Sequence, residues 1–152
     1  MQNRPYKRPE SVLVVVYSRD GQVLMLRRTV PADFWQSVTG SLEWGETPVQ
    51  AARRELEEET GLDAADGLVD AAEQRSFPIL PAWRARYAPD VSSNLEHWFY
   101  FAVDRPMAVR VAAAEHSEYR WLPWREAAAL ASSYTNRDAI TALAGSALPN
   151  WV

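Results

Sequence analysis

The sequence predicts an α/β domain in which a mixed sheet is layered with helices. Two almost continuously apolar segments, 12–17 and 23–28, are separated by a short polar turn and are typical of paired, buried strands. A capped helix over 47–61 follows them, and later strand patterns precede two helix patterns. Because strands flank one central helix without a repeated strand–helix unit, we expect a sheet of mixed direction.

The strands are predicted from their apolar patterns and from the turns that end them. The first two are joined through Asp20-Gly21, where glycine tolerates the positive φ of a tight hairpin turn. A third strand is expected over 35–38, where apolar and polar residues alternate before Gly40 ends it. The same reasoning predicts further strands over 68–75, 95–103, 107–112 and 119–122.

The central helix carries the clearest start and stop signals. Thr47 can cap it, Pro48 suits its first turn, Gln50 completes a capping box and Gly61 ends it. We expect it to pack on the sheet through an apolar stripe of Val49, Ala52 and Leu56.

Two further helices are expected near the end of the chain. One covers 124–131 after Pro123, and the other covers 136–143, where Thr135 and Asp138 repeat a capping pattern. Between the strands, the segment 76–94 contains several prolines and aromatic residues and is predicted as a long irregular loop. Such loops are often functional, although composition alone fits a surface loop equally well.

Length and composition restrict the class of protein. The 152 residues suit a single domain, 1–152. The absence of cysteine excludes disulfides and zinc–thiolate sites, so a reducing compartment is acceptable. The first ten residues lack an apolar leader core and the longest apolar run is 12–17, which predicts a cytoplasmic protein without a membrane span.

The negative charge is concentrated in one short segment. Residues 40–62 hold six acidic and two basic side chains, a net −4 that equals the net charge of the whole chain. A net negative chain argues against a nucleic-acid-binding surface spread over the fold.

Three of these acids share one face of the central helix. At 100° per residue, Glu55, Glu58 and Glu59 lie within one turn, whereas Glu57 points away. Like charges at this spacing are destabilising, and a divalent cation would compensate them more fully than Arg54 alone. Oxygen ligands without His or Cys favour Mg²⁺, with Mn²⁺ as an alternative. Taken alone, the three glutamates also fit a solvated acidic face.

The surrounding residues favour the metal site. The segment satisfies the pattern G-x5-E-x7-R-E-U-x-E-E-x-G-U, in which U is a bulky aliphatic residue, at Gly40, Glu46, Arg54, Glu55, Leu56, Glu58, Glu59, Gly61 and Leu62. With this motif the chain resembles the Nudix hydrolase family. The resemblance implies a Nudix-type α/β/α sandwich with a catalytic strand–loop–helix motif. It also implies a Mg²⁺-dependent attack of water on a phosphoric anhydride.

The resemblance implies roles for individual residues. Glu55, Glu58 and Glu59 would coordinate the metal, and Arg54 would orient these carboxylates rather than touch substrate. Members of the family often take a further metal ligand or general base from outside the motif, and Glu115, in the loop before 119–122, is the candidate here. The weaker alternatives are Glu118 and Glu96.

Segments outside the motif indicate a substrate. The stretches 6–9, 34–40, 86–89, 115–116 and 133–137 resemble the branch of the family that converts 7,8-dihydroneopterin 3′-triphosphate to its monophosphate and pyrophosphate. A pyrophosphohydrolase of (deoxy)nucleoside triphosphates such as dATP is the alternative. A catalytically silent nucleotide-binding module is disfavoured, because every motif carboxylate is present.

The expected partner is a small-molecule triphosphate, with no nucleic acid and no membrane, while the oligomeric state stays open. Hydroxyl and cationic groups expected at the phosphates are Lys7, Arg28, Thr39 and Ser133. Each also has an ordinary structural explanation, as a solvated charge, a strand end, a turn or a cap. Apolar surface for a flat ring is expected from Phe77, Pro78, Ile79 and Leu80.

Overall fold

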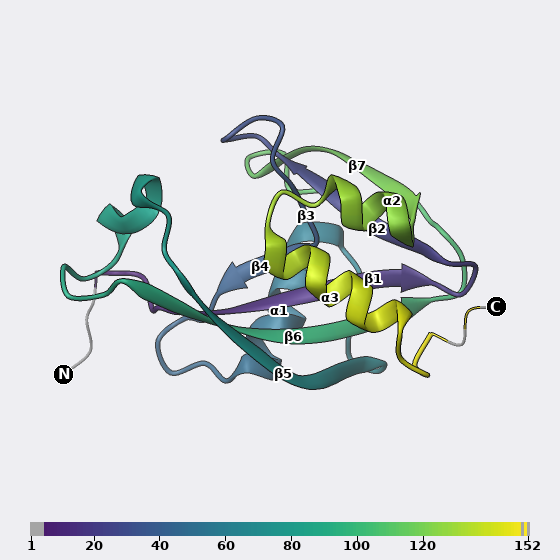
Figure 1. Ribbon diagram of the computed structural model, residues 1–152, viewed down its shortest axis with the longest axis horizontal. Coiled ribbons are helices and arrows are strands. Elements are labelled where there is room, and N and C mark those ends of the chain that lie inside the picture. The colour runs from purple at the N-terminus through teal and green to yellow at the C-terminus, as the bar shows by residue number, and fades with distance from the viewer. Residues whose placement is uncertain (1–4, 150, 152) are drawn as a thin grey trace.

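The computed structural model describes residues 5–149 and 151, so the first residues of the amino-terminal segment lie outside it. Figure 1 shows one sheet with helix α1 on its far face and helices α2 and α3 on the near face. The helices run over Pro48–Thr60 (α1), Trp124–Leu130 (α2) and Tyr134–Ala144 (α3). This arrangement is the predicted α/β/α sandwich.

Over the described residues, the sheet has seven strands of mixed direction. Its order is β3-β2-β1-β6-β5, while β4 pairs with β1 and β7 pairs with β2. The pairing of β1 with β6 is parallel and the remaining pairings are antiparallel. The strands are Glu10–Ser18 (β1), Gln22–Arg28 (β2), Trp35–Gln36 (β3), Val38–Ser41 (β4), Leu68–Pro78 (β5), Ser93–Val103 (β6) and His116–Pro123 (β7).

Strand β1 separates two hydrophobic cores, which explains its continuously apolar sequence. Val12, Val14 and Val16 belong to the core beneath α1. Leu13 and Val15 belong to the core beneath α2 and α3. Because successive side chains of a strand point to opposite faces, burial on both faces requires an apolar residue at every position.

Helix α1 begins and ends as its sequence predicts. Thr47 and Gln50 form the capping box, and Gly61 ends the helix with a φ of 77°. The predicted stripe is wrong at Val49, whose side chain is exposed, and the first buried position is Ala51. Val49 lies in the first turn, ahead of the part of the helix that contacts the sheet.

Four other expectations differ from the structure. The single strand expected over 35–38 is divided between β3, which pairs with β2, and β4, which pairs with β1 and continues through Gly40 to Ser41. Residues 107–112 form no strand, because Val109 and Val111 pack against the α1 core without strand pairing. The expected loop over 76–94 is shorter, since β5 extends to Pro78, β6 starts at Ser93, and a 3₁₀ helix, η1 (Pro81–Arg86), lies between them. Helix α3 starts earlier than expected, because the Ser133 hydroxyl accepts the amide hydrogen of Asn136 and caps it.

Among the described residues, no helix combines the length and the apolar character that crossing a membrane requires.

Candidate active site

A cavity of about 310 Å³ lies over β1, β4 and β6, beside η1 and the start of α3. It brings together residues that are far apart in the sequence. All eight side chains predicted to bind substrate line it: Lys7, Arg28, Thr39, Phe77, Pro78, Ile79, Leu80 and Ser133. Two of their hydroxyls also have structural roles, since Thr39 donates to the Val12 carbonyl at 2.9 Å and Ser133 caps α3.

Gly40 brings the cavity into contact with the glutamates of α1. It lines the cavity from β4, and the Glu55 carboxylate packs against it. A Cβ at this position would lie only 2.2–2.5 Å from the atoms of that carboxylate. Glycine is therefore required for Glu55 to pack against β4, at a residue that also lines the cavity.

Arg54 ties together the loop before α1 and the carboxylates of the helix. Its Nε and Nη2 each donate to one oxygen of Glu46 at 2.8 Å, and Nη2 also donates to the Ser41 carbonyl at 3.1 Å. Its Nη1 donates to Glu55 and, at 3.3 Å, to Glu58. The bonds to Arg54 hold the pKa of Glu46 below its ordinary value. Arg54 thus positions the acidic cluster, and neither Arg54 nor the glutamates of α1 line the cavity.

Glu59 is the most unusual carboxylate of the cluster. Its side chain is 1% exposed, and neither oxygen has a hydrogen-bond partner among the described residues. Burial, and then the neighbouring Glu55 and Glu115, raise the pKa of Glu59 well above its ordinary value. A buried carboxylate without partners is costly, and such a set of hard oxygen donors fits a divalent cation.

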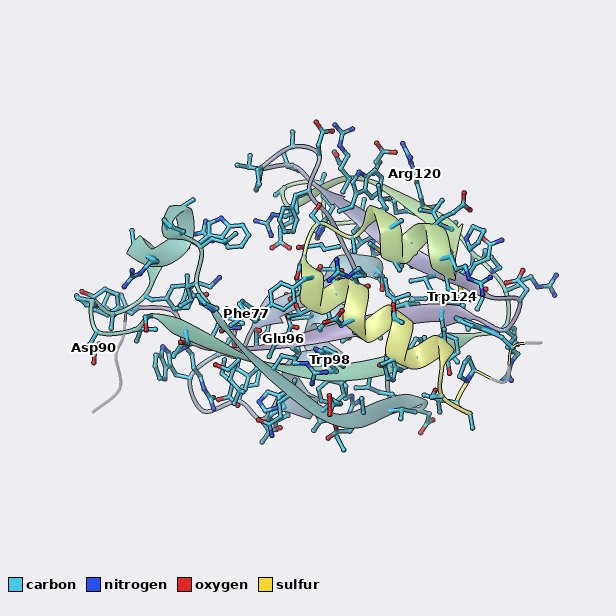
Figure 2. All side chains as sticks on the ribbon, viewed as in Figure 1. Phe77, Asp90, Glu96, Trp98, Arg120 and Trp124 are labelled. Carbon is cyan, nitrogen blue, oxygen red and sulfur yellow. The ribbon has the colours of Figure 1, made fainter. Side chains whose placement is uncertain are left out.

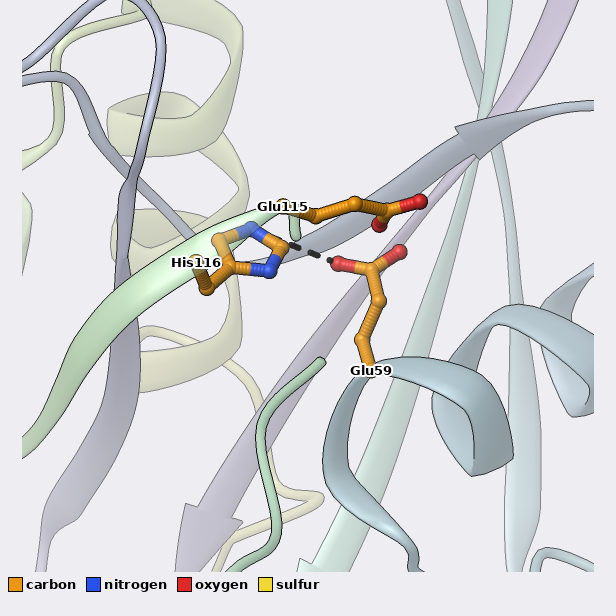
Figure 3. A group of neighbouring side chains, drawn as sticks. All are labelled: Glu59, Glu115 and His116. Atoms are coloured by element: carbon orange, nitrogen blue, oxygen red, sulfur yellow. Dashed lines mark ion pairs between the residues drawn. The ribbon is translucent and has the colours of Figure 1, made fainter. Parts of the chain in front are cut away.

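Glu115 and His116 lie beside Glu59, as Figure 3 shows. One ligand atom from each of the three residues lies within 4.8 Å of the others. The structure therefore brings Glu115, from the loop before β7, to the buried end of α1. Glu58 lies at the surface of α1. The remaining desolvation of its carboxyl group, and then the negative charge of Glu55, raise the pKa of Glu58.

His116 lies at the site beside Glu59, although no role for it was predicted from the sequence. Its Nε2 lies 3.7 Å from Glu59 and 3.3 Å from the Gln36 amide nitrogen. Burial, and then the charge of Arg28, lower the pKa of His116 to about 4, so the ring is neutral at pH 7. It is consequently a polar neighbour of Glu59 and not its counter-ion.

The two weaker alternatives for the base lie elsewhere. Glu118 pairs with Arg27 at 3.0 Å on neighbouring strands. Glu96 is buried in the cavity wall beside Trp98. Neither belongs to the group of ligand atoms around Glu59, and the predicted metal ligands Glu55 and Glu58 also lie outside that group.

Three positively charged side chains lie in the wall of the cavity. Lys7, Arg28 and Arg86 all line it, and the backbone amide of Lys7 donates to the Arg86 carbonyl at 2.9 Å. Burial, and then Arg86 and Arg28, lower the pKa of Lys7, while burial and Arg86 lower that of Arg28. Three mutually repelling cations lining one cavity are suited to a polyanion.

Aromatic side chains form part of the same wall. The rings of Phe34 and Trp83 meet edge to face at 5.9 Å, and the Arg28 guanidinium lies 5.5 Å from the centre of the Trp83 ring. Phe77 adds a third ring to the lining. These flat surfaces are suited to a heterocycle.

Comparisons with known proteins agree with this geometry. The chain is 46% identical over 144 residues to the dihydroneopterin triphosphate diphosphatase of Escherichia coli K12, a match that covers 92% of this chain and 95% of the relative. It is 41% identical to the Haemophilus influenzae protein of the same name, over 89% of this chain and 87% of the relative.

A solved structure of the E. coli dihydroneopterin triphosphate pyrophosphohydrolase superimposes with a TM-score of 0.84 at 47% identity, covering 89% of this chain and 94% of that one. The NUDIX domain model matches residues 7–143. The motif, the sandwich and these matches lead to one conclusion: the chain belongs to the NUDIX family of hydrolases.

Proposed function

We propose that this chain hydrolyses 7,8-dihydroneopterin 3′-triphosphate to dihydroneopterin monophosphate and pyrophosphate. The observation that carries the proposal is a cavity lined by three cations and by aromatic side chains, whose Gly40 is in contact with Glu55 of the acidic cluster. Relatives that carry this activity in their names match nearly the whole chain and support the choice of substrate.

Glu55, Glu58, Glu59 and Glu115 would hold the divalent metal, which we propose to be Mg²⁺, with Mn²⁺ able to replace it. The fit rests on the two unpartnered oxygens of buried Glu59 and on the nearby Glu115 carboxylate. A bound metal of this kind polarises phosphate oxygens and lowers the pKa of its water. Arg54 keeps the carboxylates of Glu55 and Glu58 in place through its hydrogen bonds.

Other side chains of the protein bind the triphosphate and accept the proton of the attacking water. Lys7, Arg28 and Arg86 neutralise and orient the triphosphate, because all three line the cavity. Glu115 is the proposed general base, since it is exposed yet close to Glu59 and so can accept a proton from the attacking water. Water adds across the anhydride bond between the α- and β-phosphorus atoms and breaks it, so that pyrophosphate is released and a monophosphate remains on the pterin.

A substrate panel tests the proposal. Purified protein with Mg²⁺ would be given dihydroneopterin triphosphate, dATP and the other deoxynucleoside triphosphates, and the products would be separated by chromatography. We expect the highest kcat/KM with dihydroneopterin triphosphate, yielding pyrophosphate and the monophosphate. Protein that leaves this compound intact while hydrolysing dATP would overturn the choice of substrate, and release of orthophosphate alone would contradict the reaction.

A further inference from the structure

Two buried polar side chains of the cavity wall have no part in the reaction described above. Asn94 and Glu96, both on β6, line the cavity and are only 4% and 5% exposed. Figure 2 places Glu96 in the same part of the sheet as Phe77 and Trp98. Phe77 is paired with Asn94 across β5 and β6, so polar and aromatic groups lie together here.

The hydrogen bonds of Asn94 leave one of its atoms without a partner. Its Nδ2 donates to the Ser11 hydroxyl at 2.8 Å, which fixes the orientation of the amide. The carbonyl oxygen Oδ1 is buried and has no hydrogen-bond partner among the described residues. A buried acceptor without a partner is costly, so a donor from a ligand would stabilise it.

Glu96 is a second acceptor in the same wall. One of its oxygens accepts the indole hydrogen of Trp98 at 3.1 Å. Burial raises the pKa of Glu96, whereas Trp98 and Thr135 favour its charged form. Because a carboxylate oxygen has two lone pairs, the group can accept further hydrogen bonds while it keeps the bond from Trp98.

The acceptors of Asn94 and Glu96 require donors from the ligand. A 2-amino-4-oxopyrimidine ring, as found in pterins, presents an exocyclic amino group next to a ring N–H. The amino group carries two hydrogens, one for each residue, and the ring N–H can also bond to the carboxylate. Phe77 and the neighbouring apolar residues supply the flat surface against which such a ring can lie.

We propose that Asn94 and Glu96 form the subsite that selects the ring, by accepting hydrogen bonds from its exocyclic amino group and adjacent ring N–H. The inference rests on the proposed function, since it assigns a position to the heterocycle of that substrate. The two residues would determine specificity without contacting the reacting phosphorus.

A comparison of GTP with ITP measures the contribution of the exocyclic amino group to recognition. Guanine carries the same two adjacent donors as a pterin, whereas hypoxanthine lacks only the amino group. We therefore expect wild-type protein with Mg²⁺ to have a kcat/KM for GTP roughly tenfold higher than for ITP, with the difference in KM. In Glu96→Gln, where one acceptor becomes a donor, the ratio should fall to about two or less.

A matched control is Glu126→Gln, on the exposed surface of α2, which should keep the wild-type ratio. A purely structural role for Glu96 predicts equal losses for both nucleotides and an unchanged ratio, and this result would overturn the inference. The wild-type ratio decides the matter even if Glu96→Gln does not fold, because a ratio near one also overturns it. Failure of the proposed function looks different: dihydroneopterin triphosphate stays intact while GTP is still preferred to ITP.

Discussion

The site has an acidic side, formed by the cluster around Glu59, and a basic side, formed by the cations that line the cavity, and the two are built differently. Both crowd like charges, but the carboxylate of Glu59 is buried with no partner among the described residues. On the basic side, Lys7 lies 5.8 Å from the centre of the Tyr87 ring, and Arg28 donates to the Val30 carbonyl at 2.9 Å. The acidic side therefore depends on an added cation, whereas the basic side is partly satisfied by the protein itself.

This difference predicts how strongly each side resists change. Substitution of the buried Glu59 on the acidic side should greatly lower turnover and alter the stability of the metal-free protein, because an uncompensated buried charge is removed. Substitutions on the basic side should weaken binding, because each cation supplies only part of the attraction for the triphosphate.

The largest effect is expected for Glu59→Gln. Loss of a metal ligand should lower kcat/KM by about 100-fold or more. In the presence of a chelator the same variant should unfold at a temperature roughly 2–4 °C higher, since the buried charge is gone. Steady-state kinetics and calorimetry measure the two effects. Glu57→Gln, on the exposed face of α1, is the control and should change neither.

Gly40→Ala should have the next largest effect. The new methyl group would collide with the Glu55 carboxylate, which is the movable end of a side chain and can shift without unfolding the protein. We expect kcat to fall by about tenfold or more while the circular dichroism spectrum is retained. Gly145→Ala meets only ordinary contacts and serves as the control. Full activity of Gly40→Ala would show that the position of Glu55 is unimportant.

A smaller effect is expected from Lys7→Met on the basic side. Removing one of three cations should raise KM about fivefold to tenfold and leave kcat within about threefold of wild type. The exposed Arg105→Gln, which also removes a positive charge, should leave KM unchanged. A kcat that falls while KM is unchanged would show that Lys7 acts in the chemical step, and this would contradict its assignment to binding of the triphosphate.

The smallest effect on turnover is expected for Glu46→Gln, which weakens the brace of the acidic side. Because Arg54 lowers the pKa of Glu46 in the folded protein, its stabilisation is present above the unfolded pKa of 4.5 and is lost as the pH falls through the lower folded pKa. Denaturant titrations should show a loss of about 1–2 kcal/mol at pH 7, and a smaller loss near pH 3.5. The exposed Glu43→Gln should show no such pH-dependent difference.

The parts of the molecule that could be predicted from the sequence are those determined locally. The caps of α1 act within one helical turn, so Thr47 and Gly61 indicated both its ends. The alternation over 107–112 was misleading, because apolar residues at alternate positions can pack on a core without joining the sheet. Periodicity reports which residues are buried and does not report which backbone groups are paired.

The site was only partly predictable for the same reason. The acidic face of α1 follows from helical spacing, but the approach of His116 to Glu59 depends on how β7 packs beside α1. The three cations of the basic side come from segments that only the folded sheet and η1 bring together. Asn94 and Glu96 alternate along an ordinary strand, so nothing in their local pattern distinguishes them from core positions.

The central claim is that a metal joins the two sides of the site through the triphosphate. The most direct test measures the Kd of an α,β-methylene analogue of GTP, which resists cleavage, by calorimetry with Mg²⁺ and with a chelator. We predict that Mg²⁺ tightens binding about tenfold or more in the wild type, and that this gain disappears in Glu59→Gln. Equal affinity of the wild-type protein with and without Mg²⁺ would contradict the account.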